Sequence, residues 1–81
     1  MAIAGALIVP VNRQAELSLV RRLGNVAEVE IEIEAVGPKG VAVVMEAGLL
    51  ELKAVSSEIK AWDEVLDFEL AYLNWEEEGQ S

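Results

Sequence analysis

Two segments of the chain alternate between apolar and acidic residues. In the first segment, Val29, Ile31 and Ile33 are each flanked by glutamates. In the second, Asp67 and Glu69 are each flanked by apolar residues. Because side chains on a β-strand point to alternate sides, a period of two residues predicts strands with one buried side and one solvent-facing side. We therefore expect two strands of one sheet that show carboxylates to water on the side away from the core.

The length of the chain limits how it can be stabilised. Its 81 residues suffice for one small domain, and they include 53% hydrophobic residues and no cysteine. A domain of this size buries only about 60% of the surface that its unfolded chain exposes. Without disulfides, packing of nearly all large apolar side chains, or weak self-association, must supply the stability. We expect the domain to span residues 1–74 and an acidic, flexible C-terminal tail to span residues 75–81.

The charge of the chain favours cationic partners. Fifteen acidic and six basic residues give a formal net charge of −9, which repels nucleic acid phosphates and anionic lipid. The apolar stretch at residues 2–9 has no basic residue before it, and no apolar run approaches the roughly 20 residues of a membrane span. We expect a cytoplasmic protein that inserts into no membrane and binds no nucleic acid.

The first part of the chain predicts a strand followed by a helix. An apolar run at residues 3–9 is ended by a proline, as is typical of a central strand. A helix is expected over residues 13–23, because Asn12 can cap its start and Gly24 and Asn25 can supply a left-handed stop. The apolar side of this helix is expected to carry Leu17, Val20 and Leu23.

The rest of the chain predicts a hairpin, a second helix and a last strand. The acidic strand at residues 27–34 leads through a Gly-Pro-Lys-Gly turn to a strand at residues 41–46. A helix over residues 48–62 is expected to lie on the sheet through apolar residues in helical spacing, namely Leu52, Val55, Ile59 and Trp62. The last strand is expected over residues 65–73, with Leu66, Phe68, Leu70 and Tyr72 on its buried side.

The order of these elements, β-α-β-β-α-β, is that of an α+β, ferredoxin-like fold. Right-handed crossovers place both helices on one face of a four-stranded antiparallel sheet with the strand order 4-1-3-2. The two acidic strands become the edges of this sheet, and the face away from the helices stays open. Because the fold hosts many activities, function has to be inferred from the residues on that face.

The residues expected on the open face suit a cationic, amphipathic peptide. Three inter-strand steps of about 4.8 Å place the acidic edges roughly 14 Å apart, which admits a helix of about 10–12 Å diameter. Between the edges we expect apolar side chains from the two middle strands, namely Ala4, Ala6, Ile8, Ala42 and Val44. Since both sides of the middle strands are apolar, a shift by one residue would instead expose Ile3, Leu7, Val41 and Val43.

The acidic edges are also compatible with two different roles. Charged edge strands prevent aggregation between sheets, without any binding function. The same fold occurs in regulatory or oligomerisation modules that resemble ACT or effector domains, which dimerise through sheets or edges and bind a small ligand there. A regulatory or oligomerisation module of this kind is the alternative to peptide binding.

The residue types that usually perform chemistry are missing. Without histidine or cysteine a metal site would have only carboxylates, and the sequence has no Asp-rich calcium loop. No Gly-rich phosphate-binding loop precedes either helix. General acid–base catalysis by carboxylates would need a pocket that so small a core cannot spare. We therefore expect neither an enzyme nor a bound cofactor or metal.

Three segments of the chain carry a family resemblance. They are the apolar strand near the N-terminus, the Gly-Val-Ala-Val-Val-Met-Glu-Ala strand at residues 40–47, and the Val-Leu-Asp-Phe-Glu-Leu-Ala-Tyr strand at residues 65–72, which runs into a Glu-rich tail. These segments resemble the NapD family, small cytoplasmic chaperones that assist maturation of the periplasmic nitrate reductase. The resemblance covers nearly the full length of the chain.

This resemblance implies a partner. NapD-like chaperones bind the twin-arginine signal peptide of a nitrate reductase catalytic subunit or a related molybdoenzyme precursor and delay export until its cofactor is loaded. The chaperone itself needs no cofactor. Such a peptide is basic at its start and apolar after it, which suits acidic edges around an apolar floor. The expected peptide-binding residues are Ala4, Ala6, Ile8, Glu30, Glu32, Ala42, Val44, Asp67, Glu69, Ala71 and Leu73.

Overall fold

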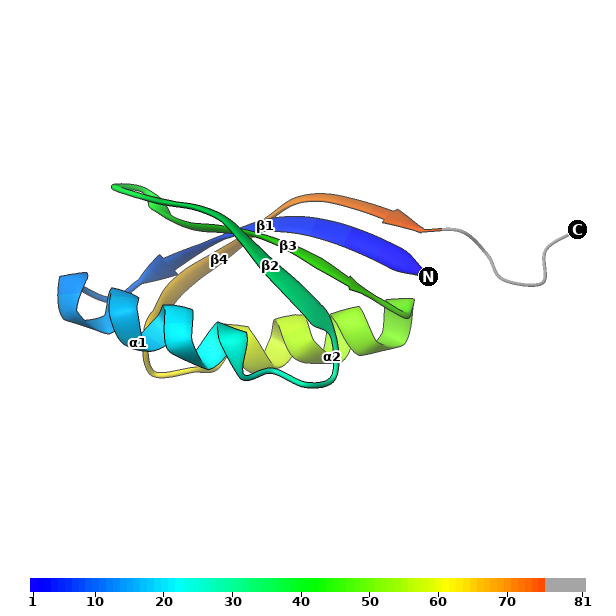
Figure 1. Ribbon diagram of the computed structural model, residues 1–81, viewed down its shortest axis with the longest axis horizontal. Coiled ribbons are helices and arrows are strands. Elements are labelled where there is room, and N and C mark those ends of the chain that lie inside the picture. Colours follow the sequence, from blue (N-terminus) through cyan, green and yellow to red (C-terminus); the bar gives the residue numbers. More distant parts are fainter. Residues whose placement is uncertain (76–81) are drawn as a thin grey trace, which may run out of the picture.

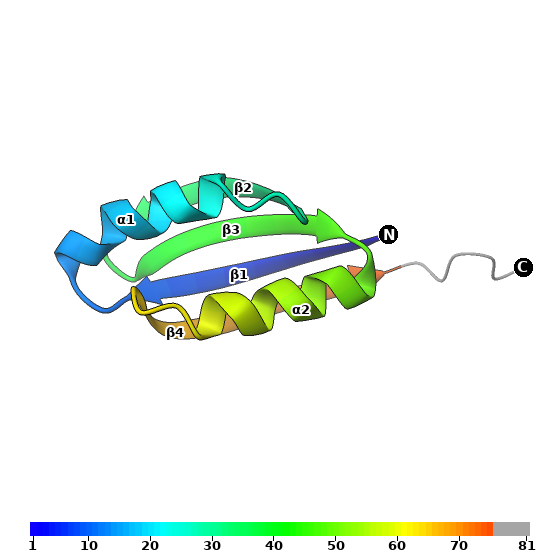
Figure 2. The same ribbon diagram turned by 90° about the horizontal axis from the view of Figure 1, so that it is seen from below.

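A four-stranded antiparallel sheet with two helices on one face makes up the protein, as the computed structural model shows for residues 1–75. The strand order is β2-β3-β1-β4, so the predicted ferredoxin-like fold class and strand order are confirmed. Figures 1 and 2 show both helices on the same side of the sheet. The elements are β1 (Ala2–Pro10), α1 (Arg13–Gly24), β2 (Glu30–Gly37), β3 (Gly40–Ala47), α2 (Leu49–Lys60) and β4 (Val65–Trp75).

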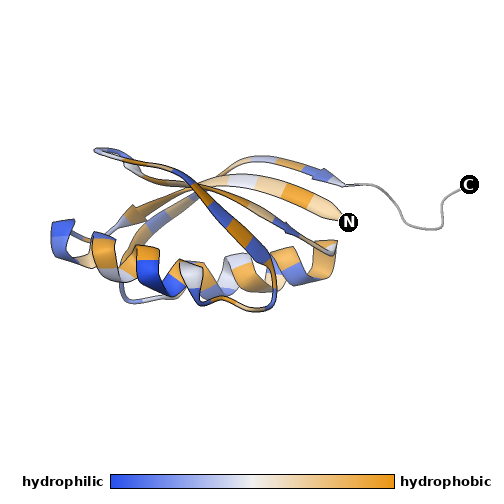
Figure 3. Ribbon diagram, viewed as in Figure 1, coloured by the Kyte–Doolittle hydropathy of each residue, from blue (hydrophilic) through white to orange (hydrophobic). Residues whose placement is uncertain are grey.

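The core lies between the sheet and the two helices. The middle strands β1 and β3 contribute alternate residues to it, and the helices contribute one apolar side each. Figure 3 shows the alternation of hydrophobic and hydrophilic residues most clearly along β2. The buried apolar side chains of the middle strands and the helices are those of Ala2, Ala4, Ala6, Ile8, Val41, Val43, Met45, Leu19, Leu23, Leu52, Val55 and Ile59.

The predicted orientation of β1 was wrong. Ala4, Ala6 and Ile8 were expected on the open face, but they are only 2%, 4% and 0% exposed and face the helices. The three alanines on this side of β1, Ala2, Ala4 and Ala6, leave room for the larger side chains of the helices to approach the sheet. The alternative set on β1, which includes Ile3 and Leu7, therefore lies on the open face.

Helix α1 begins where predicted, but the side that it packs against the sheet differs from the predicted apolar side. The side-chain oxygen of Asn12 accepts a hydrogen bond of 2.8 Å from the backbone N–H of Ala15, which confirms the cap. Leu17 is 60% exposed, and Leu19 is buried in its place. The predicted left-handed conformation at the end of this helix was wrong. Asn25 has a φ of −102° and closes the helix through its backbone N–H.

Helix α2 packs as predicted. Its expected apolar positions Leu52, Val55 and Ile59 are buried, and Trp62, just beyond its end, is 7% exposed. The preceding hairpin between β2 and β3 turns at Gly40, which has a φ of 140°. A Cβ at that position would also lie 2.7 Å from the backbone oxygen of Ile8, so glycine is required there for two reasons.

Strand β4 contains two β-bulges, which the sequence pattern did not indicate. Its register against β1 shifts twice, leaving Leu66 and Ala71 without a partner. Each extra residue changes the side to which the following side chains point. Of the four residues expected on the buried side of β4, Phe68 packs against the core, whereas Leu66, Leu70 and Tyr72 are 69%, 52% and 45% exposed.

The C-terminal boundary differs slightly from the expected one. Strand β4 includes Trp75, which was assigned to the tail and is 51% exposed. The remainder of the predicted acidic tail, residues 76–81, lies outside the described residues.

One ionic cluster ties α1 to the connection between α2 and β4. Arg22 Nη1 lies 2.9 Å from Glu64 Oε1, and the hydroxyl of Ser18 donates a hydrogen bond of 3.1 Å to Glu64 Oε2. The guanidinium of Arg22 also lies 4.3 Å from the ring centroid of Trp62. The cluster thereby covers one edge of the core with a charged layer.

The Glu64 carboxylate should make stability depend on pH. A hydrogen bond from its own backbone N–H lowers the pKa of Glu64, and hydrogen bonds from Ser18 and Arg22 lower it further. Partial desolvation raises this pKa, but the net result lies below the ordinary value of 4.5. A lowered folded-state pKa stabilises the protein above pH 4.5, and this contribution is lost as the pH falls through the folded-state pKa. Glu64→Gln should therefore lower the urea midpoint at pH 7 and have a smaller effect under acid conditions.

The matched control for this prediction is Glu58→Gln, at an exposed glutamate of α2. Its effect on the urea midpoint should be small and the same at both pH values. A Glu64→Gln effect that is as large in acid as at pH 7 would contradict the assigned role of the carboxylate.

Candidate functional site

The sheet face away from the helices, here called the open face, is the candidate site. Residues paired across antiparallel strands share a face, so the register gives its rows. The first row is Glu30, Glu46, Ile3 and Asn74; the second is Glu32, Val44, Gly5 and Tyr72; the third is Ala35, Ala42, Leu7 and Glu69; and Val9 pairs with Asp67 beyond them.

The acidic residues of this face gather at two opposite corners. Glu30 and Glu32 on β2 lie beside Glu46 on β3, and this group is here called the β2–β3 corner. Asp67 and Glu69 lie one to three rows away on the opposite edge and form the β4 corner. The sequence had suggested two parallel acidic edges, whereas the register places these five carboxylates diagonally across the sheet. Glu34 is the exposed extra residue at a register shift in β2 and belongs to neither corner.

Between the two corners runs an apolar strip. It consists of Ile3, Leu7 and Val9 from β1, Ala42 and Val44 from β3, and the ring of Tyr72 from β4. Ala42 and Val44 lie on the open face as expected, since their neighbours Val41, Val43 and Met45 are buried. On β1, Ile3, Leu7 and Val9 thus take the place of the expected Ala4, Ala6 and Ile8.

Two residues predicted for peptide binding lie elsewhere on β4. Leu73 pairs with the buried Ala4 and packs against the core, so its expected place on the open face was wrong. Ala71 is the exposed extra residue of a bulge, beside the strip. The bulge also brings Tyr72 to the open face, although the alternation in the sequence assigned it to the buried side.

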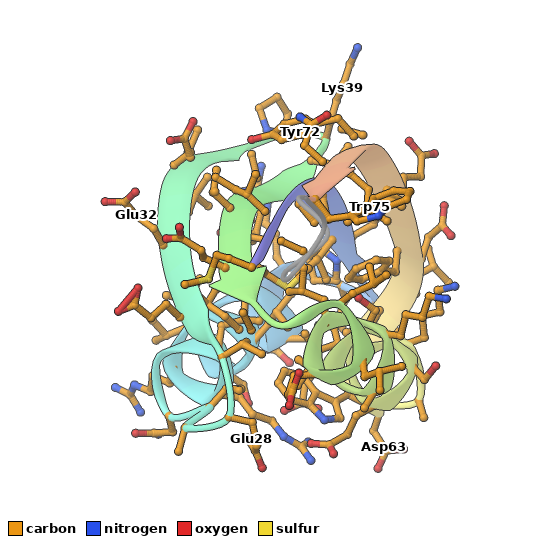
Figure 4. All side chains as sticks on the ribbon, turned by 90° about the vertical axis from the view of Figure 1, so that its right-hand side faces the viewer. Glu28, Glu32, Lys39, Asp63, Tyr72 and Trp75 are labelled. Atoms are coloured by element: carbon orange, nitrogen blue, oxygen red, sulfur yellow. The ribbon has the colours of Figure 1, made fainter. Side chains whose placement is uncertain are left out.

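Among the residues of the face that sequence reasoning missed, Glu46 and Tyr72 bear most on binding. Glu46 continues the outward series of Ala42 and Val44, and this period of two was a usable signal. Tyr72 had no such signal, because only the bulge at Ala71 turns it outward. Figure 4 shows Tyr72 above the sheet on the side away from the helices and Glu32 projecting from the β2 edge.

Positive charge is concentrated on the other side of the molecule. Five of the six basic residues lie in the helices, namely Arg13, Arg21, Arg22, Lys53 and Lys60, and the sixth, Lys39, lies in the turn of the β2–β3 hairpin. Of these six side chains, all within residues 1–75, only Arg22 forms an ion pair, with Glu64. The open-face carboxylates are thus not neutralised by any lysine or arginine of the chain.

Two hollows adjoin the β2–β3 corner. One, of about 610 Å³, is lined by Glu30, Glu32 and Glu46 together with Val44 and the connection before β2. The other, of about 300 Å³, lies between Ile3, Glu46 and Trp75. Both combine carboxylates with apolar walls, which suits long cationic side chains with an aliphatic stem.

Residues 1–75 contain no cluster of acidic side chains placed to bind a metal ion. Neither helix in this part of the chain has the length and apolar character needed to cross a membrane. No protein-family model matches the chain, and no curated protein or solved structure matches it.

Proposed function

We propose that the open face docks a cationic, amphipathic peptide. The observation that carries this proposal is the segregation of charge: five carboxylates border the open face, while five of the six basic residues lie in the helices. The electrostatic field of this charge distribution attracts and orients a basic partner at long range. The apolar strip between the corners then supplies the surface whose burial stabilises the complex.

The chemistry of the face matches one class of peptide in particular. A twin-arginine signal peptide carries a basic pair followed by an apolar stretch. The β2–β3 corner and the β4 corner suit the basic part, and the strip of Ile3, Leu7 and Val44 suits the apolar part. The sheet is about 14 Å wide between its edge strands, which accommodates a helical peptide of about 10–12 Å diameter.

Together with the resemblance to NapD, this leads to a specific role. The chain is proposed to be a cytoplasmic chaperone for the signal peptide of a periplasmic nitrate reductase or a related molybdoenzyme precursor. Bound to the open face, the arginine pair would be shielded from the export machinery until the client has received its cofactor. The chaperone needs no cofactor and performs no catalysis in this scheme.

A regulatory or oligomerisation module is the second candidate, because the edge strand β4 shows exposed apolar residues. Leu66 and Leu70 are 69% and 52% exposed. Against edge pairing stand the two bulges of β4, which interrupt its regular hydrogen-bonding edge, and the carboxylates of Asp67 and Glu69. Sedimentation equilibrium decides between the candidates, since such a module requires a stable dimer.

The proposed function is tested by calorimetric titration with a synthetic twin-arginine signal peptide at two salt concentrations. Micromolar or tighter binding that weakens with added salt is expected, because charge attraction contributes to the encounter and is screened. No heat at several temperatures, together with a stable dimer in sedimentation, would overturn the chaperone proposal in favour of the oligomerisation module.

A further inference from the structure

A glycine in the middle of the open face is covered by an aromatic ring. Gly5 lies at the centre of β1 and pairs with Tyr72 on β4 and Val44 on β3. Its backbone does not require glycine, because among the described residues only Gly40 has a positive φ. A Cβ at Gly5 would collide with the Tyr72 ring, with Cζ at 2.7 Å and Cδ2 at 2.8 Å. The missing side chain of Gly5 therefore makes room for the ring.

The ring thereby forms a flat aromatic surface on the sheet. Three adjacent ring atoms, Cε2, Cζ and Cδ2, are the closest neighbours of the Gly5 position, so the ring itself covers the glycine. Gly5 is buried beneath it, while Tyr72 remains 45% exposed. In Figure 4 Tyr72 lies on the side of the sheet away from the helices. One side of the ring rests on β1, and the other side is available to a ligand.

This surface lies between the two acidic corners. One row from Gly5 in one direction, Ile3 pairs with Glu46; one row in the other direction, Leu7 pairs with Glu69. With about 4.8 Å between strands and about 6.6 Å between rows, each carboxylate-bearing residue is roughly 8 Å from Gly5, measured between Cα atoms. A cation that rests on the ring is thus within reach of a carboxylate on either side.

We propose that Tyr72 is the residue that distinguishes arginine from lysine in the docked peptide. This inference rests on the proposed function and adds to it the chemical group that is recognised. Carboxylates attract both cations, so the corners alone confer little preference. A planar, weakly hydrated guanidinium stacks on an aromatic ring better than a compact, strongly hydrated ammonium does. The ring of Tyr72 holds one guanidinium of the arginine pair, and Glu46 or Glu69 accepts hydrogen bonds from its edge.

The test compares the affinities of a twin-arginine peptide and its twin-lysine counterpart by calorimetry. The wild-type protein should prefer the arginine peptide about tenfold, the size expected for a partly desolvated cation–π contact. Tyr72→Leu should lower the affinity for the arginine peptide about tenfold, leave that for the lysine peptide nearly unchanged, and so remove the preference. Tyr72→Phe keeps the ring and should keep the preference.

Two further variants make the result specific. Gly5→Ala leaves the tyrosine in place but displaces its ring, and it should reduce the preference as Tyr72→Leu does. Leu70→Ala removes another half-exposed side chain of β4, which is 52% exposed and pairs with the buried Ala6 on the helix side, and it should leave the preference intact. Circular dichroism and urea midpoints identify any variant that has lost its fold.

The outcomes separate this inference from the proposed function. If the wild-type protein binds neither peptide, the proposed function itself fails. If it binds the arginine peptide, but folded Tyr72→Leu shows the same ratio of the two affinities as the wild-type protein, the proposed function stands and the role of Tyr72 is overturned.

Discussion

Replacing Ile8 by alanine is expected to lower the free energy of unfolding by about 2–5 kcal/mol. Ile8 is 0% exposed, at the helix-facing side of the middle strand β1, and it pairs with Val41 and Phe68 on the two flanking strands. Truncation removes apolar contacts and leaves a cavity that the sheet cannot close easily. Since domains are typically stabilised by about 5–15 kcal/mol, this is a large fraction of the total.

The adjacent residue provides the matched control. Leu7 is half-buried on the open face, where it pairs with Ala42 and Glu69. Leu7→Ala removes a side chain of the same size from a site without helices above it, so its cost should be less than half that of Ile8→Ala. Urea unfolding at neutral pH measures both. Equal losses, or a larger loss for Leu7→Ala, would contradict the orientation of β1.

Reversing the charge at Glu30, Glu32 and Glu69 is expected to weaken binding of a twin-arginine peptide by about 10- to 100-fold. An exposed ion pair contributes about 0.2–1 kcal/mol, and each reversal replaces such an attraction by a repulsion. The association rate should fall most, because the carboxylates act mainly by steering the encounter. The dependence of affinity on salt should become flatter. Calorimetry and stopped-flow kinetics at two salt concentrations measure these effects.

A triple variant with the same net charge controls for the global change. Glu28→Lys, Glu58→Lys and Asp63→Lys also raise the formal net charge from −9 to −3, since three reversals of two units each are made. Glu28 and Asp63 lie on the helix side of the molecule in Figure 4, and Glu58 lies in α2. This variant should retain most of the affinity. If both triple variants bind equally well, the open face is not the docking surface.

The order of elements was predictable because local signals agreed with one another. The Asn12 cap, the hairpin turn and the helical spacing of Leu52, Val55 and Ile59 each reflect interactions within a few residues. Element bounds were less predictable, as β2 begins at Glu30 and extends to Gly37 rather than covering residues 27–34. Ends of strands depend on pairing with neighbours, which a single segment does not encode.

The orientation of β1 could not be read from its composition. Ile3 and Leu7 on one side and Ala4 and Ile8 on the other are all apolar, so hydrophobic alternation carries no information there. The helices decide the matter, because their large side chains pack against the side of β1 that is rich in alanine. The acidic residues of β2 were predictable for the opposite reason, since burying an unpaired carboxylate in the interior is too costly.

The candidate site depends on register, and register was the part least visible in the sequence. The bulges at Leu66 and Ala71 arise from the way in which β4 matches β1. The bulge at Ala71 shifts Tyr72 to the open face. The diagonal placement of the two acidic corners has a different cause, because β2 and β4 run in opposite directions and each carries its carboxylates near its start. The acidic residues of the edge strands were therefore predictable from sequence and topology, whereas the outward turn of Tyr72 was not.

The two tryptophans give this chain two separate optical probes. Trp62 is 7% exposed beneath Arg22, so its fluorescence should change mainly when the helices leave the sheet. Trp75 is 51% exposed and lines the hollow beside Ile3 and Glu46, so its emission should respond to a molecule bound at that end of the sheet. With Trp62 or Trp75 replaced by phenylalanine in turn, unfolding and occupancy can each be followed without any attached dye.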